Sequence, residues 1–123
     1  MELPSYSCVL CMHDIEETLF HLILECPFAQ ECWINISLFT DLSQEPYSIL
    51  NSFRIQLQVK FFMEVIILMC WCIWMERNDY IFQGINPSVH SAMSRFKVVF
   101  TQVMLRVKED WKQLMIEWLD RTL

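Results

Sequence analysis

A chain of 123 residues, 54% of them hydrophobic, is long enough to bury one sizeable core and too apolar to be intrinsically disordered. The net charge is −6, and residues 1–53 hold eight acidic side chains and no Lys or Arg. Because phosphate contacts supply most non-specific nucleic-acid affinity, this charge distribution argues against a protein that binds nucleic acid through its N-terminal half.

The six cysteines bear on the compartment in which the protein works. Six cysteines would suit the disulfide framework of a small secreted domain. The N-terminal sequence MELPSYSC, however, has neither the basic segment nor the apolar core of a secretion signal. We therefore expect a reducing compartment, which is the cytoplasm or the nucleus.

Four potential metal ligands follow one another near the N-terminus in the pattern C-x2-C-x9-H-x4-C. Cys8 and Cys11 are close enough for one tight turn to place both thiolates on the same ion. His21 and Cys26 follow at the far end of a short helix that Asp14 is expected to cap. Three thiolates and one imidazole form a closed tetrahedral site, so we predict a structural zinc ion. The alternative is a set of reduced core cysteines with a buried histidine.

The same run resembles a known family. With EET before His21, FAQECW after Cys26 and WCIWMERNDYIFQG farther on, it is similar to the zinc-binding region near the C-terminal end of reverse transcriptase proteins of plant LINE-type retrotransposons. The resemblance covers roughly the first two-thirds of the chain and implies the same four ligands. Family members usually carry a Trp- and Phe-rich stretch upstream of the first cysteine, so we expect a stand-alone fragment. Nothing in the chain resembles a polymerase or nuclease domain.

A fifth cysteine leaves the ligand set open. The segment from Pro27 to about Phe39 has the pattern of a short helix, and Cys32 lies inside it. Cys32 could replace His21 or Cys26 as a ligand. A cysteine within a helix is more often part of the core, however, because free cysteine is among the most buried residue types.

Helix boundaries farther along the chain follow from Pro and Gly. Gly84, the only glycine, lies where a left-handed C-cap is expected, and Asn86 and Pro87 supply an N-cap and a first-turn residue for the next helix. In chain order we expect a polar linker over 40–46, a helix over 46–57 with a break near residue 58, a helix over 59–83 and a helix over 87–121.

The helix expected over 59–83 contains an unbroken apolar run of eleven residues, Val65–Met75. A membrane span needs about twenty apolar residues, and a run of 10–14 is more often a buried helix. We therefore predict a central helix buried within the protein, with Cys70 and Cys72 in its core, and no membrane span.

The last helix has an apolar pattern that repeats every eleven residues, which indicates a nearly straight, core-facing helix. Thirty-five helical residues span about 50 Å, more than the diameter of about 35 Å expected for a compact domain of this length. Either the helix bends near Val98 and Val99, or it packs against another chain. Val98, Leu105 and Ile116 align on the opposite face, and we predict a homodimer through these three residues.

Together these patterns predict a mainly α protein: a small zinc-knuckle-like Cys3His module over 1–39, and a helical bundle with a long C-terminal helix over 40–123, packed as a single domain. The sequence shows no nucleophile with a base beside it, no phosphate-binding Gly loop and no open metal site, so we do not expect an enzyme. We expect a protein–protein interaction module, and an RNA-binding zinc knuckle is the alternative. The resemblance permits a host role in defence, fertility or a toxin–antidote pair.

Overall fold

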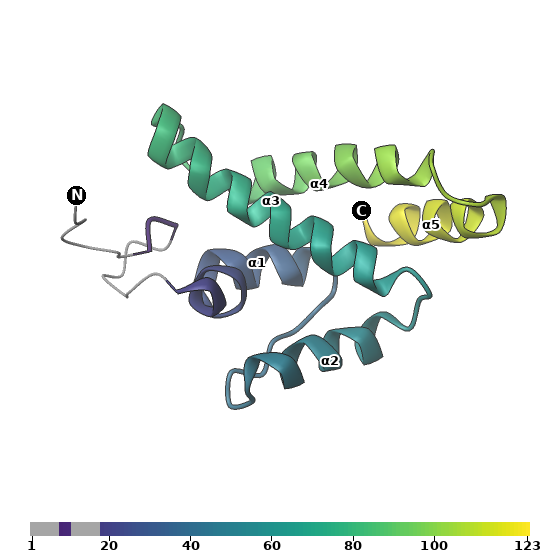
Figure 1. Ribbon diagram of the computed structural model, residues 1–123, viewed down its shortest axis with the longest axis horizontal. Helices are drawn as coiled ribbons and strands as arrows, with labels where there is room; N and C mark the ends of the chain where they lie inside the picture. The colour runs from purple at the N-terminus through teal and green to yellow at the C-terminus, as the bar shows by residue number, and fades with distance from the viewer. Residues whose placement is uncertain (1–7, 11–17) are drawn as a thin grey trace.

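The computed structural model describes residues 8–10 and 18–123, and the regular elements in these ranges are all helices, which confirms the mainly α fold (Figure 1). The Asp14 cap predicted for the first helix lies outside the described residues. In chain order the elements are η1 (His21–Glu25, a single π-helical turn), α1 (Pro27–Asn35), α2 (Pro46–Leu57), α3 (Phe62–Gln83), α4 (Val89–Met104) and α5 (Glu109–Thr122).

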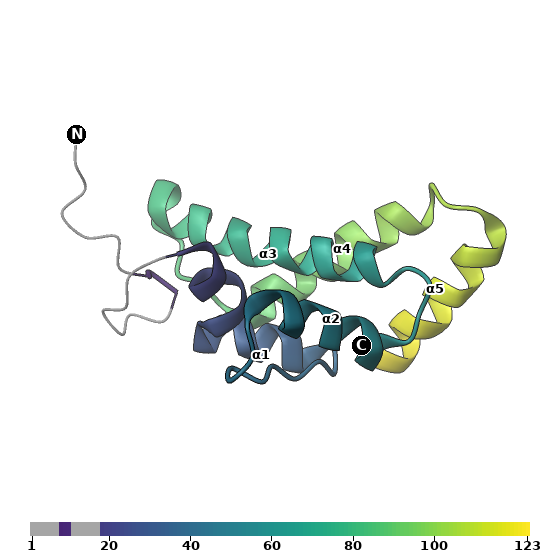
Figure 2. The same ribbon diagram turned by 60° about the horizontal axis from the view of Figure 1, so that its bottom comes forward.

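Helix α3 is the centre of the arrangement. It packs against α4, α2, α1 and η1, and α4 also packs against α1 and α5. Figure 2 shows α3 and α4 running side by side, with α1 and α2 below them. Buried residues of the segment 18–39 and of the helices after it form one hydrophobic core, so the part that carries the metal motif rests directly on the bundle.

Two of the predicted helix ends are confirmed. Gln58 and Gly84 both adopt left-handed conformations, with φ of 50° and 68°, and end α2 and α3. Three other boundaries differ from the prediction. Helix α3 begins at Phe62, after the expected residue 59. Helix α1 ends at Asn35, before the expected Phe39, and Ser37 follows it with φ 65°. The N-cap of α4 is Ser88 and not the predicted Asn86, and the Oγ of Ser88 accepts a hydrogen bond from the N–H of Ser91.

The C-terminal helical region is divided in two, but not at the predicted bend. Val98 and Val99 lie inside α4, and the break comes after that helix. The chain leaves the helical path between α4 and α5, over residues 105–108, and α5 turns back toward the middle of the molecule (Figure 1). The turn brings the ring of Trp118 within 5.2 Å of Phe100 and 6.0 Å of Phe61, centroid to centroid. Burying Trp118 in this way is worth several kcal/mol, on the order of 2 for the area and about 1 for each aromatic pair.

This turn also separates the three residues predicted to form a dimer interface. Val98, Leu105 and Ile116 are exposed, as expected. They belong to α4, to its C-cap and to α5, however, and the two helices run in different directions. The straight line of side chains that motivated the prediction therefore does not exist.

Helix α3 is less buried than its apolar sequence predicted. Cys72 is buried, but Cys70 is only half-buried, and four large side chains are exposed on the same face: Met63, Ile67, Trp71 and Trp74. In the part of the chain that the structure describes, no helix is both long enough and apolar enough to cross a membrane. The exposed side of α3 is therefore an apolar surface of the folded protein.

The one acidic side chain buried among the described residues, Glu76, joins α3 to the start of α4. Its carboxylate accepts hydrogen bonds from the N–H of Ser88 at 3.1 Å and the hydroxyl of Ser91 at 2.9 Å. Arg95 lies 3.5 Å from the same carboxylate and 2.6 Å from that of Asp79. Glu76 thus stabilises the first turn of α4, where its negative charge also interacts favourably with the helix dipole.

We expect Glu76→Ala to lower the free energy of unfolding by about 3 kcal/mol, because it leaves the N–H of Ser88 and the hydroxyl of Ser91 without their acceptor, whereas Arg95 keeps Asp79. Urea denaturation followed by circular dichroism would measure the change. Glu117→Ala, an exposed Glu on α5, is the matched control and should shift stability by no more than about 0.5 kcal/mol. Equal losses in the two variants would contradict the role of Glu76.

Candidate metal centre

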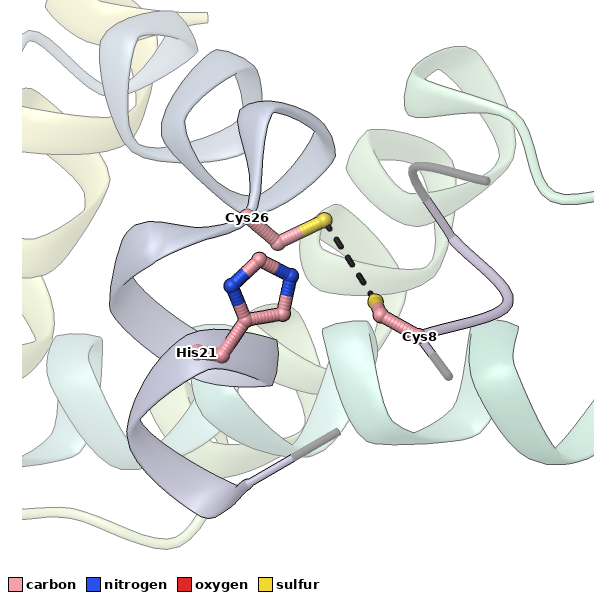
Figure 3. Close-up of side chains that lie close together, drawn as sticks. All are labelled: Cys8, His21 and Cys26. Atoms are coloured by element: carbon pink, nitrogen blue, oxygen red, sulfur yellow. Dashed lines mark hydrogen bonds between the residues drawn. The ribbon is translucent and has the colours of Figure 1, made fainter. Parts of the chain in front are cut away.

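Three of the four predicted ligands come together in the structure. The sulfur atoms of Cys8 and Cys26 and a ring nitrogen of His21 all lie within 4.8 Å of one another, and all three residues are buried. Figure 3 shows the three side chains pointing toward one another from two separate stretches of chain. The fourth predicted ligand, Cys11, lies outside the described residues.

The distance between the two sulfur atoms matches the demands of a tetrahedral metal ion. Cys8 Sγ donates a hydrogen bond to Cys26 Sγ across 3.7 Å. A disulfide would need an S–S distance of about 2.05 Å, so these cysteines are not bonded to each other. Two thiolates that each lie about 2.3 Å from one tetrahedral zinc ion are about 3.8 Å apart. The donor set therefore fits zinc without rearrangement of the two sulfur atoms.

The π-helical turn explains how His21 and Cys26 reach the same point. On an α-helix, residues five apart point about 140° away from each other, because each residue turns the chain by about 100°. In η1 the N–H of Cys26 instead bonds to the carbonyl of His21 at 2.6 Å, an i to i+5 closure. The wider turn brings the imidazole and the thiol to one side of the chain, facing Cys8.

A buried tryptophan fixes this turn to the rest of the fold. The indole N–H of Trp33, on α1, donates a hydrogen bond of 2.8 Å to the carbonyl of Ile23, in the middle of η1. The same ring packs against Phe53 of α2, with centroids 4.7 Å apart. Trp33 is fully buried, so it connects the turn that carries His21 to both neighbouring helices.

The surroundings of Cys26 act on its thiol in two directions. Burial raises the pKa of Cys26 to about 12, while the backbone N–H groups of Ala29 and Phe28, in the first turn of α1, act to lower it. Those two N–H groups point at the sulfur and would stabilise a thiolate, and a bound cation would supply the remaining stabilisation. Pro27 begins α1 directly after Cys26, as the sequence predicted.

Cys32 is not part of this group of ligands. It is fully buried in α1, where burial raises its pKa to about 12 and the nearest charges and thiols acting on it are Glu76, Cys72 and Glu31. Among the described residues, the group of His, Cys and acidic side chains that could hold a metal contains Cys8, His21 and Cys26. Cys32 therefore has the core role that a cysteine inside a helix usually has.

Two contributors to the site were not recognised from the sequence. Trp33 belongs to the FAQECW segment, but its hydrogen bond to a backbone carbonyl ten residues away leaves no local pattern in the sequence. Thr18 accepts a hydrogen bond at its Oγ1 from the N–H of His21, 3.0 Å away, and its position three residues before His21 is the one available signal.

Comparisons of the chain with known protein families, with curated proteins and with solved structures find no match. The assignment of the ligands therefore depends on their spacing in the sequence and on the geometry of Cys8, His21 and Cys26.

Alkylation with iodoacetamide would test which cysteines depend on a metal. Without chelator, we expect Cys8 and Cys26 to be protected. With a strong chelator both should react, because loss of the ion releases the segment that holds them. Cys32 and Cys72 should stay unmodified in both conditions, since burial raises the pKa of each to about 12 and keeps the reactive thiolate scarce.

Peptide mass mapping of the alkylated protein gives the result for each cysteine. Modification of Cys32 together with Cys26 after chelation would contradict the assignment of Cys32 to the core. Identical labelling of Cys8 with and without chelator would contradict a metal at this site.

Proposed function

We propose that the protein is a non-enzymatic protein–protein interaction module whose N-terminal part is held by a structural zinc ion. The observation that carries the proposal is the buried convergence of Cys8, His21 and Cys26, with the two sulfur atoms 3.7 Å apart. Cys11 completes the proposed shell, since Cys3His zinc sites are closed and structural. The ion stabilises the packing of η1 on α1 and α3, on which the exposed surface of the protein depends.

An apolar groove beside α3 has a lining that supports a binding role over a catalytic one. This groove is lined by side chains of η1, α2 and α3 and of Leu19 and Phe20, and Cys70 is its one titratable lining residue. Burial raises the pKa of Cys70 to about 12, so its thiol is neutral near pH 7 and a poor nucleophile. Such a lining suits contact with another apolar surface.

The proposed origin is a plant LINE-type retroelement, on the strength of the Cys3His spacing and the segments FAQECW and WCIWMERNDYIFQG. A host role in defence, fertility or a toxin–antidote pair is compatible with such an origin. The reduced cysteines and the zinc chemistry favour work in the cytoplasm or nucleus, where thiols stay reduced. The partner is another protein or a second copy of the chain.

The zinc proposal predicts a large effect of one ligand substitution. Purified wild-type protein should contain one zinc per chain. Cys26→Ser should contain none, and its free energy of unfolding should be lower by several kcal/mol. Apparent zinc binding free energies are about 10 kcal/mol, and in a closed site they are part of folding. Metal analysis by mass spectrometry and urea denaturation would measure both quantities.

Cys70→Ser is the matched control, because Cys70 is half-buried and lies outside the metal group. It should keep full zinc content and most of its stability. Wild-type protein without zinc, together with unchanged stability in Cys26→Ser, would refute the structural metal site.

The alternative function is an RNA-binding zinc knuckle, and the charge distribution makes it testable. The N-terminal half has no Lys or Arg, and the nine basic residues from position 54 onward are mixed with seven acidic ones. We expect single-stranded RNA to bind no more tightly than tens of micromolar at physiological salt. A fluorescence anisotropy titration with submicromolar affinity under these conditions would favour the RNA-binding function instead.

A further inference from the structure

The exposed face of α3 borders an apolar groove. A groove of about 450 Å³ runs between α3 and the segment that leads into η1. Six of its side chains are large, apolar and exposed: Leu19, Phe20, Met63, Ile67, Trp71 and Trp74. On α3 these residues recur at positions i, i+4, i+8 and i+11, so they form one stripe along the helix, about 17 Å long.

The groove carries no charge. No Asp, Glu, Lys, Arg or His contributes to its lining, although a fifth of the residues of the chain are charged. The guanidinium of Arg77 lies over the ring of Trp74, 4.7 Å from its centroid, at one end of the stripe. The centre of a contact between two copies would contain no ionised side chain, whose burial is the most costly event in forming an interface. The repulsion between two chains of net charge −6 acts from more distant surfaces and is screened beyond about 8 Å at physiological salt.

The exposed area is close to what a stable dimer requires. The six side chains are between 39% and 65% exposed, which amounts to roughly 600 Å² per copy at about 200 Å² for a large side chain. A pair of copies would bury about 1,200 Å², at the lower end of specific interfaces and above the size of typical crystal contacts. An apolar patch of this size is at the upper end of what a typical monomer leaves uncovered, and such patches are often functional.

The face also has the shape that a symmetric contact needs. In a two-fold dimer the same patch must supply both the hollow and the part that fills it. Here one patch contains a groove and, at its lining, Leu19 and Ile67, which are 65% and 56% exposed. Each copy can thus insert exposed side chains into the groove of the other.

We propose that a second copy of this chain covers the groove, so that the protein is a two-fold homodimer through α3 and the two residues before η1, Leu19 and Phe20. The inference deepens the proposed interaction function and rests on it, because η1, held by the metal site, forms one wall of the groove. It places the dimer contact on α3 instead of on Val98, Leu105 and Ile116, which are divided between two helices of different direction.

Sedimentation equilibrium of three full-length proteins tests this interface. Wild type should sediment at twice the chain mass of 14.9 kDa at tens of micromolar and dissociate on dilution. Ile67→Glu should raise the dissociation constant at least about tenfold, because it places a charge in the centre of the contact. Leu105→Glu adds the same charge at a more exposed site outside the groove and should leave the dissociation constant unchanged.

Tryptophan fluorescence gives a second, independent measurement. Trp71 and Trp74 are exposed in the groove, whereas Trp33 and Trp118 are buried in the core. Quenching by acrylamide should therefore increase as wild type is diluted and stay at the higher level in Ile67→Glu at every concentration. If Ile67→Glu loses helix content, Met63→Glu, which is also exposed in the groove and keeps both tryptophans, replaces it in both measurements.

Zinc content, measured in all three proteins, separates this inference from the proposed function. A wild type that carries zinc and remains monomeric at tens of micromolar overturns the dimer and leaves the zinc-held module standing. A dimer that Leu105→Glu dissociates, alone or as strongly as Ile67→Glu does, overturns the assignment to the groove. A wild type that contains no zinc and is monomeric contradicts the proposed function itself.

Discussion

The π-helical turn between His21 and Cys26 is the constraint on which the N-terminal part of the structure depends. An α-helix would point the side chains of His21 and Cys26 apart. The i to i+5 hydrogen bond of this turn brings them to the same point, where Cys8 meets them. The turn is held in place by the hydrogen bond from Trp33 to Ile23, and Trp33 in turn packs on Phe53 of the next helix. A metal ion at this point would therefore link local ligand geometry to the packing of the bundle.

The sequence was sufficient to predict that Cys8, His21 and Cys26 meet, but not how they meet. Cysteine and histidine are chemically specific, so the spacing of Cys8, His21 and Cys26 carries information that survives without a structure. The π-helical turn has no such signature, because it differs from an α-helical turn by one hydrogen bond. The contact of Trp33 with Ile23 is equally invisible, since it depends on how α1 lies against η1.

The bundle shows the same division between local and tertiary causes. Gly84 ends α3 as predicted, because its left-handed conformation is a local preference of glycine. The break before α5 was not predictable from the apolar period, because it results from packing of Trp118 against Phe100 and Phe61, distant in the chain. The apolar run of α3 correctly indicated a helix, but composition alone could not show that Ile67 and Trp71 face outward. The proposed association depends on that exposed face.

X-ray absorption spectroscopy at the zinc edge tests the central claim most directly, because it counts the ligands of the ion, including Cys11. A closed Cys3His site predicts three sulfur neighbours at about 2.3 Å and one nitrogen neighbour at about 2.0 Å, with no water in the shell. A purified protein that holds no zinc, or a zinc ion surrounded mainly by oxygen, would contradict it.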